Sequence, residues 1–116
     1  MIHHFGVNEG RITLNRMVEL LATNPAKLFG LYPRKGTIAP GSDADIVIFD
    51  PDRKKVISAA DQHSKSDYNL YEGTEVTGDV DTTLIRGTVV VSDGELRVEP
   101  GFGNFVKRAR FGEQLL

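Results

Sequence analysis

The sequence predicts an α+β fold in which helices come first and a separate β-sheet follows. Two observations lead to this prediction. Near the N-terminus, Leu14, Met17, Val18 and Leu21 fall at i, i+3, i+4 and i+7, which is the spacing of one helix face. Short apolar runs bounded by glycine, proline and aspartate, which are typical of strands, appear only after residue 45. Segregated helices and strands of this kind indicate an α+β arrangement with two N-terminal helices and short strands.

The first helix is predicted over residues 14–23. Thr13 is placed to cap its N-terminus, and Ile12 and Met17 are placed to form a hydrophobic staple across the cap. Asn24-Pro25 is predicted to end this helix, because proline disfavours the α conformation in the residue before it. Proline also suits the first position of a helix, so a short second helical turn is expected over residues 26–29. Gly30 is suited to close that turn in the left-handed conformation.

The predicted strands occupy the middle and the end of the chain. Ile46 to Phe49 is a continuous apolar run, expected to be buried on both faces. Asp93-Gly94 is a strong hairpin turn, since both residues tolerate positive φ. The other expected segments are a turn at 52–55 followed by a strand at 56–57, a polar stretch at 58–82, strands at 83–86, 88–91 and 96–98, and an extended tail from residue 100.

Length and composition exclude several classes of protein. The 116 residues contain no cysteine, so disulfides, thiolate nucleophiles and cysteine-bound zinc are excluded. The formal net charge of -2 gives no general attraction to nucleic acid or to an anionic membrane. No apolar run approaches the roughly 20 residues of a membrane span, and no signal peptide is recognisable. The sequence therefore predicts a cytoplasmic protein without nucleic-acid or membrane partners.

The histidines do not form a metal motif. His3 and His4 are adjacent, so in an extended chain they point to opposite sides and do not easily share one metal ion. His63 has no histidine at ligand spacing. A surface or packing role is favoured for all three, and no metal ligand is assigned.

Four acids cluster around the first predicted strand, at Asp43, Asp45, Asp50 and Asp52. Alternating acids could line a cation site, but a calcium loop needs more oxygen ligands in one short stretch and a closing glutamate. Asp50-Pro51 is also a common turn opener. Turn formation and strand-end capping are the favoured roles.

No other pattern supplies an active site. Gly101-x-Gly103 lacks the third glycine of a phosphate-binding loop, and no serine has the context of a nucleophile elbow. The tail mixes aromatic with basic residues, which could bind a single strand of nucleic acid. An arm that packs onto the same or a neighbouring subunit is favoured. The aromatic residues are Phe102, Phe105 and Phe111, and the basic ones are Lys107, Arg108 and Arg110. No catalytic, substrate-binding or metal-binding residue is predicted in this chain.

Longer stretches resemble the dihydropyrimidinase and D-hydantoinase family of amidohydrolases over essentially the whole chain. The Gly41-Ser42-Asp43-Ala44-Asp45-Ile46-Val47 segment recurs among amidohydrolases generally. Asp67-Tyr68-Asn69 with Glu72-Gly73 is a more specific pointer to the hydantoinase branch. The resemblance extends over residues 10–16, 23–31, 33–51 and 67–73, Arg86-Gly87 with the following run 88–91, and the glycine-rich basic tail.

The resemblance implies a much longer parent subunit. Its (β/α)₈ barrel would hold two zinc ions, whose bound hydroxide attacks the ring amide of a dihydropyrimidine or hydantoin. The metal ligands and the substrate-contacting residues would all lie upstream of Met1. Residues 1–31 would then be the last helices packing on the barrel, 32–99 the C-terminal part of a small β-sandwich, and 100–116 an arm. The family also implies a homo-oligomer, either a dimer or a tetramer.

Two alternatives stay open from the sequence. Dihydropyrimidinase-related scaffold proteins keep the same C-terminal pattern without the zinc ligands, so the parent could be non-catalytic. A free-standing oligomerisation module is the other alternative, although the apolar helix face at residues 14–21 needs a partner. A sheet without its companion strands exposes open edges, so the isolated chain is expected to self-associate or to be unstable.

Overall fold

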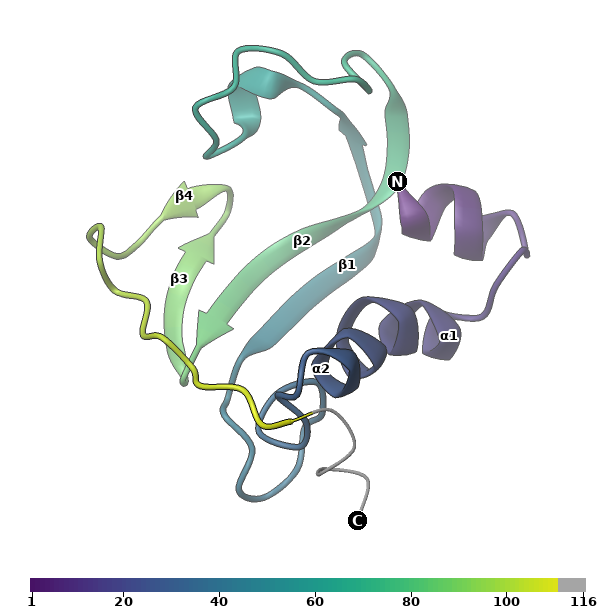
Figure 1. Ribbon diagram of the computed structural model, residues 1–116. Coiled ribbons are helices and arrows are strands. Elements are labelled where there is room, and N and C mark those ends of the chain that lie inside the picture. The colour runs from purple at the N-terminus through teal and green to yellow at the C-terminus, as the bar shows by residue number, and fades with distance from the viewer. Residues whose placement is uncertain (111–116) are drawn as a thin grey trace.

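A computed structural model describes residues 1–110 and has the predicted α+β architecture (Figure 1). Helical segments occupy the N-terminal quarter, and one antiparallel sheet follows in the order β1-β2-β3-β4. No helix in this part of the chain is long and apolar enough to cross a membrane. The helical elements are η1 (His3–Asn8), α1 (Leu14–Val18), η2 (Glu19–Thr23), α2 (Asn24–Leu28) and η3 (Ala59–Asp61), and the strands are β1 (Ile46–Val56), β2 (Glu75–Ile85), β3 (Thr88–Ser92) and β4 (Glu95–Leu96).

The main helix begins where the sequence predicts. The Thr13 hydroxyl accepts a hydrogen bond from the Arg16 amide at 3.2 Å, which confirms the N-cap. The predicted break at Asn24 is wrong, because α1, η2 and α2 follow one another without interruption and Asn24 is helical, with φ -66° and ψ -45°. The η2 segment is a π-helix, in which the Asn24 amide bonds to the Glu19 carbonyl. Pro25 lies in the first turn of α2, a position that suits proline.

The sequence analysis missed the N-terminal helix. Residues 3–8 form η1, a single π-helical segment, before Gly10 reverses the chain with φ +71°. The Gly6 carbonyl accepts hydrogen bonds from the amides of Arg11 and Ile12, at 2.9 and 3.0 Å, which folds the connection back onto η1. The segment is short and has no 3.6-residue apolar repeat, so periodicity gave no signal for it.

Two long strands, rather than short ones, form the centre of the sheet. β1 and β2 have 11 residues each and pair from Ile46 opposite Leu84 to Val56 opposite Glu75. The predicted turn at 52–55 and separate strand at 56–57 are therefore wrong. The Asp50 carboxylate accepts hydrogen bonds from the amides of Asp52 and Arg53, and this local turn becomes a register shift within β1.

The second half of the predicted polar stretch belongs to the sheet. β2 begins at Glu75, eight residues before the predicted strand start, and carries Gly78 within it. The β3–β4 hairpin turns at Asp93 and Gly94, with φ of +52° and +75°, as the Asp-Gly pair predicts.

A loop folds back from α2 to the sheet and is held against the helix at Gly36. The amides of Leu31 and Tyr32 both donate to the Ala26 carbonyl, and the Thr23 hydroxyl donates to the Gly36 carbonyl at 2.8 Å. Gly36 has φ +81°, and a side chain there would meet the Ala26 Cβ at 2.4 Å and the Ala22 carbonyl oxygen at 2.9 Å. Only glycine allows this close approach.

The core of the described chain is thin. Among residues 1–110, the only apolar side chains classed as buried are those of Met17, Ala26, Val76 and Val90. The accessible surface of the chain is 8607 Å². A compact monomer of 12.8 kDa exposes about 6,300 Å². Helices and sheet thus leave large parts of their apolar faces uncovered.

Replacing Gly36 with alanine tests the close contact between the loop and α2. We expect Gly36→Ala to lower the free energy of unfolding by about 3 kcal/mol, because positive φ and a backbone clash act together. Gly41→Ala in the same loop is the matched control. Gly41 also has positive φ, +90°, but nothing lies within 4 Å of its added Cβ, so we expect a loss of about 1 kcal/mol. Denaturant unfolding of the three chains at one low protein concentration measures the difference, and equal losses would contradict the close contact.

Candidate functional site

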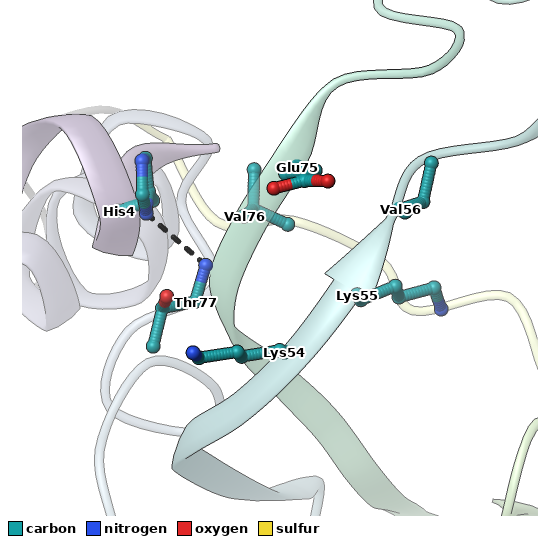
Figure 2. A pocket seen from close by; sticks show the side chains of 7 residues that line it. All are labelled: His4, Lys54, Lys55, Val56, Glu75, Val76 and Thr77. Carbon is teal, nitrogen blue, oxygen red and sulfur yellow. Dashed lines mark hydrogen bonds between the residues drawn. The ribbon is translucent and has the colours of Figure 1, made fainter.

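The helices and the sheet meet most closely where η1 contacts β2. His3 and His4 of η1 both reach the backbone of Thr77 in β2, and we call these three residues the histidine clamp. The Nδ1 atom of His3 lies 2.9 Å from the Thr77 carbonyl oxygen, and the Thr77 amide donates to the Nδ1 atom of His4 at 3.1 Å (Figure 2). The two imidazoles therefore satisfy both backbone polar groups of one strand residue.

The clamp replaces a missing strand. Thr77 pairs with Lys54 of β1 on one side, whereas the register of β3 with β2 covers only Thr82 to Ile85. On its other side, β2 is consequently an open edge at Thr77. Unpaired backbone groups in a half-buried place are unfavourable, and the histidines remove that cost.

A glycine makes room for His3. Gly78 has φ +99°, and a Cβ atom there would lie 2.3 Å from the Nδ1 of His3 and 2.7 Å from the Phe49 ring. His3 is 7% exposed and packs edge-on against Phe49, with ring centroids 4.9 Å apart. Gly78 is therefore the residue that admits the clamp into the sheet.

The adjacent histidines therefore do not diverge as they would in an extended chain. Because residues 3 and 4 are helical, both rings turn towards β2 and serve a structural role. His63 lines another hollow, together with Arg53 and Asp79. Across residues 1–110, no three histidine or acidic side chains converge in a way that could hold a metal ion.

The hollow beside the clamp has a volume of about 360 Å³ and lies between η1 and the ends of β1 and β2 (Figure 2). Lys55 is engaged in an ion pair with Asp79 at 3.3 Å. The wall of the hollow offers two lysine amines, one glutamate carboxylate and the His4 ring. The lining residues are His4, Lys54, Lys55, Val56, Glu75, Val76 and Thr77.

A network of ion pairs makes a second joint at the opposite end of the sheet. Lys35 bridges Asp43, at 2.8 Å, and Asp45, while Arg34 donates to Asp43 at 2.9 Å. The other oxygen of Asp45 accepts the Arg86 amide of the β2–β3 turn at 2.9 Å. The loop that leaves α2 is thereby tied to the sheet.

The network shifts the titration of its members in the directions expected for ion pairs. Hydrogen bonds from Lys35 and then Arg34 lower the pKa of Asp43. Burial alone would raise the pKa of Asp45, but the bonds from Lys35 and the Arg86 amide outweigh it and lower that pKa. Burial opposes the charge of Lys35, yet its two carboxylate partners raise its pKa.

The four acids singled out in the sequence do not gather into one site. Asp43 and Asp45 belong to the ion-pair network, which the sequence did not reveal because its basic side chains lie 8 to 10 residues away and the Arg86 amide lies 41 residues away in the chain. Asp50 forms the local turn, as predicted, and Asp52 contributes its backbone amide to that turn.

The described part of the tail returns to the body of the chain. Arg86 lies over the Phe102 ring, 4.7 Å from its centroid, and donates to the Phe102 carbonyl at 3.0 Å. Further along, the Ala109 amide donates to the Gly30 carbonyl. Phe105 is 94% exposed, and Phe111 lies outside the described residues. Of the two phenylalanines in the described part of the tail, Phe102 thus packs against its own chain and Phe105 does not.

The main helix presents an uncovered apolar face. Of the four residues that predicted its amphipathic pattern, only Met17 is buried, and Leu21 is 55% exposed. The same helix also exposes Leu14, Val18, Leu28 and Phe29. In the sheet, Val47 and Ile48 of the edge strand β1 are more than half exposed. Exposed apolar area of this extent marks an interaction surface.

Comparison with known proteins identifies what kind of chain has this surface. The model of the amidohydrolase family matches residues 1–90. The chain belongs to the amidohydrolase family. Its relatives place it in the branch of hydantoinases and dihydropyrimidinases that the sequence resembles.

Three relatives illustrate the similarity. The D-hydantoinase of Geobacillus stearothermophilus is 54% identical over 107 residues, which cover 92% of this chain and 23% of the relative. A D-hydantoinase crystal structure superposes with a TM-score of 0.91 at 51% identity, covering 96% of this chain and 24% of its own. The dihydropyrimidinase structure of Brevibacillus agri NCHU1002 gives a TM-score of 0.91 at 47% identity, covering 95% of this chain and 24% of its own. The chain therefore spans about a quarter of the length of these amidohydrolases.

The Asp45 carboxylate offers a test of the ion-pair joint. Its pKa is lowered in the fold, so its stabilisation is present above about pH 4, the ordinary carboxyl range, and is lost as the pH falls through the lowered value. Asp45→Asn should lower the free energy of unfolding at pH 7 by about 1 kcal/mol and flatten its decline between pH 5 and pH 2. Denaturant unfolding across this pH range measures both effects. Asp52→Asn is the control, and an equal change in that variant would argue against the joint.

Proposed function

We propose that this chain is the structural C-terminal portion of a zinc-dependent cyclic amidohydrolase and is inactive by itself. The parent would open the ring amide of a hydantoin or dihydropyrimidine. The observation that carries the proposal is a combination: the chain matches a quarter of D-hydantoinase with a TM-score of 0.91, and its own fold leaves apolar faces uncovered. A quarter of a folded subunit should expose the surfaces that contact the other three quarters.

The chemistry of the described residues supports a structural role. Ring-amide hydrolysis by a metal-bound hydroxide needs several histidine or carboxylate ligands around a metal ion. Residues 1–110 do not fit such a group, because no three of these side chains converge. In the proposal the two zinc ions are held by the remainder of the parent, and no step of the reaction is assigned to this chain.

Each part of the chain has a proposed structural task. Residues 1–31 would pack on the barrel through the exposed face around Val18 and Leu21. Residues 32–99 would complete a β-sandwich, in which the open edge of β1 receives strands from elsewhere in the parent. Residues 100–116 would form an arm, and the exposed Phe105 suits a contact with a neighbouring subunit of a dimer or tetramer. A cytoplasmic location is proposed from the absence of cysteine.

A chimera tests the proposal directly. The matching quarter of the Geobacillus stearothermophilus D-hydantoinase is replaced with this chain, and hydantoin hydrolysis is measured with zinc. We expect the chimera to fold and to retain hydrolysis, and this chain alone with zinc to show none. Hydrolysis by the chain alone, or a folded chimera without activity, would contradict the proposal.

One substitution locates the covered face within the same experiment. Leu21 is 55% exposed in this chain, so Leu21→Asp should change its stability by no more than about 0.5 kcal/mol. In the chimera the same change would bury a charge and should cost more than about 3 kcal/mol or prevent folding. Asn15→Asp, exposed on the same helix, is the matched control and should be tolerated in both. Tolerance of Leu21→Asp in the chimera would show that the face is not an interface with the barrel.

A further inference from the structure

We propose that the histidine clamp is an acid-sensitive latch, which fixes the helical part to the sheet at neutral pH and loosens η1, leaving only the His3 bond to Thr77, when His4 takes up a proton. The proposal stands on the two hydrogen bonds of Thr77 and does not depend on the activity of any parent protein. The residues that carry it are His3, His4, Thr77 and Gly78.

The partners of the two rings dictate different tautomers. A backbone amide only donates, so the Nδ1 atom of His4 accepts from Thr77 and must carry no proton. A carbonyl oxygen only accepts, so the Nδ1 atom of His3 donates to it and must carry a proton. His4 is consequently the Nε2–H tautomer and His3 the Nδ1–H tautomer. The clamp works only with this pair of states.

Protonation affects the two bonds unequally. A second proton on His3 would go to Nε2 and leave its bond to the Thr77 carbonyl in place. A second proton on His4 must go to Nδ1, where it would face the Thr77 N–H as a second donor. The bond is then lost, and the Thr77 amide remains without a partner on the open edge of β2. Because the bond needs an unprotonated Nδ1 atom on His4, acid opens the latch.

The charges around the clamp influence this opening from each element packed there. From β1, Lys54 stands opposite Thr77 in the register and lines the same hollow as His4, with Lys55 beside it (Figure 2). The Lys55 amine is paired with Asp79. From β2, Glu75 lines the same hollow, and from η1 itself the Phe5 ring packs edge-on against His4, with centroids 4.6 Å apart. The buried His3 ring packs against Phe49, with centroids 4.9 Å apart, and neither residue adds a carboxylate.

The latch lies where the helical part contacts the sheet, so opening it changes how firmly the helices are held. η1 makes the closest contact between the helical part and the sheet, while the other joint lies at the far end of the sheet. With the His4 bond open, the helices are still oriented by the His3 bond to Thr77, by the ion-pair network and by the loop at Gly36. The relative position of helices and sheet is shared with D-hydantoinase at a TM-score of 0.91, so the latch acts on an arrangement that the family uses.

Hydrogen exchange at the Thr77 amide of the whole chain tests the latch. We expect its protection, corrected for intrinsic exchange, to fall by roughly tenfold in total as the pH goes from 7.5 to 5.5, mostly in the lower half of that range. The Leu84 amide, in the part of β2 with strands on both sides, should keep its protection. In His4→Gln the side-chain oxygen accepts from Thr77 without titrating, so protection should become independent of pH. His63→Gln, which alters an exposed histidine, should behave as the unaltered chain.

Unchanged Thr77 protection in the unaltered chain, or the same pH dependence in His4→Gln, would overturn the latch. Loss of Leu84 protection in His4→Gln would mean that the variant unfolds, and ring ¹⁵N shifts of the unaltered chain then decide. At pH 8 we expect the Nε2–H tautomer for His4 and the Nδ1–H tautomer for His3. A proton on Nδ1 of His4 at that pH would also overturn the proposal.

Discussion

A single layer of helices beside a single four-stranded sheet cannot cover its own apolar faces, and this constraint determines most of what the structure shows. Each helix and each sheet is apolar on a face that needs a partner layer. Here Met17, Ala26, Val76 and Val90 are buried, while Leu21, Ile48 and many similar side chains stay half exposed. The apolar pattern is normal for a globular protein, but among the described residues nothing covers the outer apolar faces of the helices and the sheet. These uncovered faces explain why an ordinary composition gives so thin a core.

Because apolar packing is scarce, specific polar contacts hold the helices to the sheet. The histidine clamp acts at one end of the sheet, where Thr77 has no strand on one side. The ion pairs of Lys35 with Asp43 and Asp45 act at the other end. Both joints depend on close backbone approach, which Gly78 and Gly36 permit with positive φ. The positions of these joints fix which faces point outward and hence where a larger protein would attach.

The sequence predicts features that depend on local chemistry and misses those that depend on distant partners. The Thr13 cap and the Asp93-Gly94 turn follow from side-chain and backbone preferences within a few residues, and both are present. Asn24 was assigned to a helix end because a residue before proline prefers extended backbone, but the surrounding helix overrides this preference and Asn24 has φ -66° and ψ -45°. The split of β1 at residues 52–55 was predicted from a real local turn, but pairing with β2 carries the strand past it. The sequence did not predict that His3, His4 and Gly78 form the candidate site. Their partner Thr77 lies 74 residues from His3 and 73 residues from His4 in the chain.

The central claim is that the uncovered faces of this chain belong inside a larger zinc hydrolase. The most direct measurement is the genomic sequence read in frame upstream of the Met1 codon. The account predicts that the frame continues through a barrel-encoding region that contains a His-x-His metal motif. A stop codon immediately upstream would contradict it, and the apolar faces would then need a different partner. A continuing frame without that motif would contradict the catalytic part of the account and favour a non-catalytic scaffold.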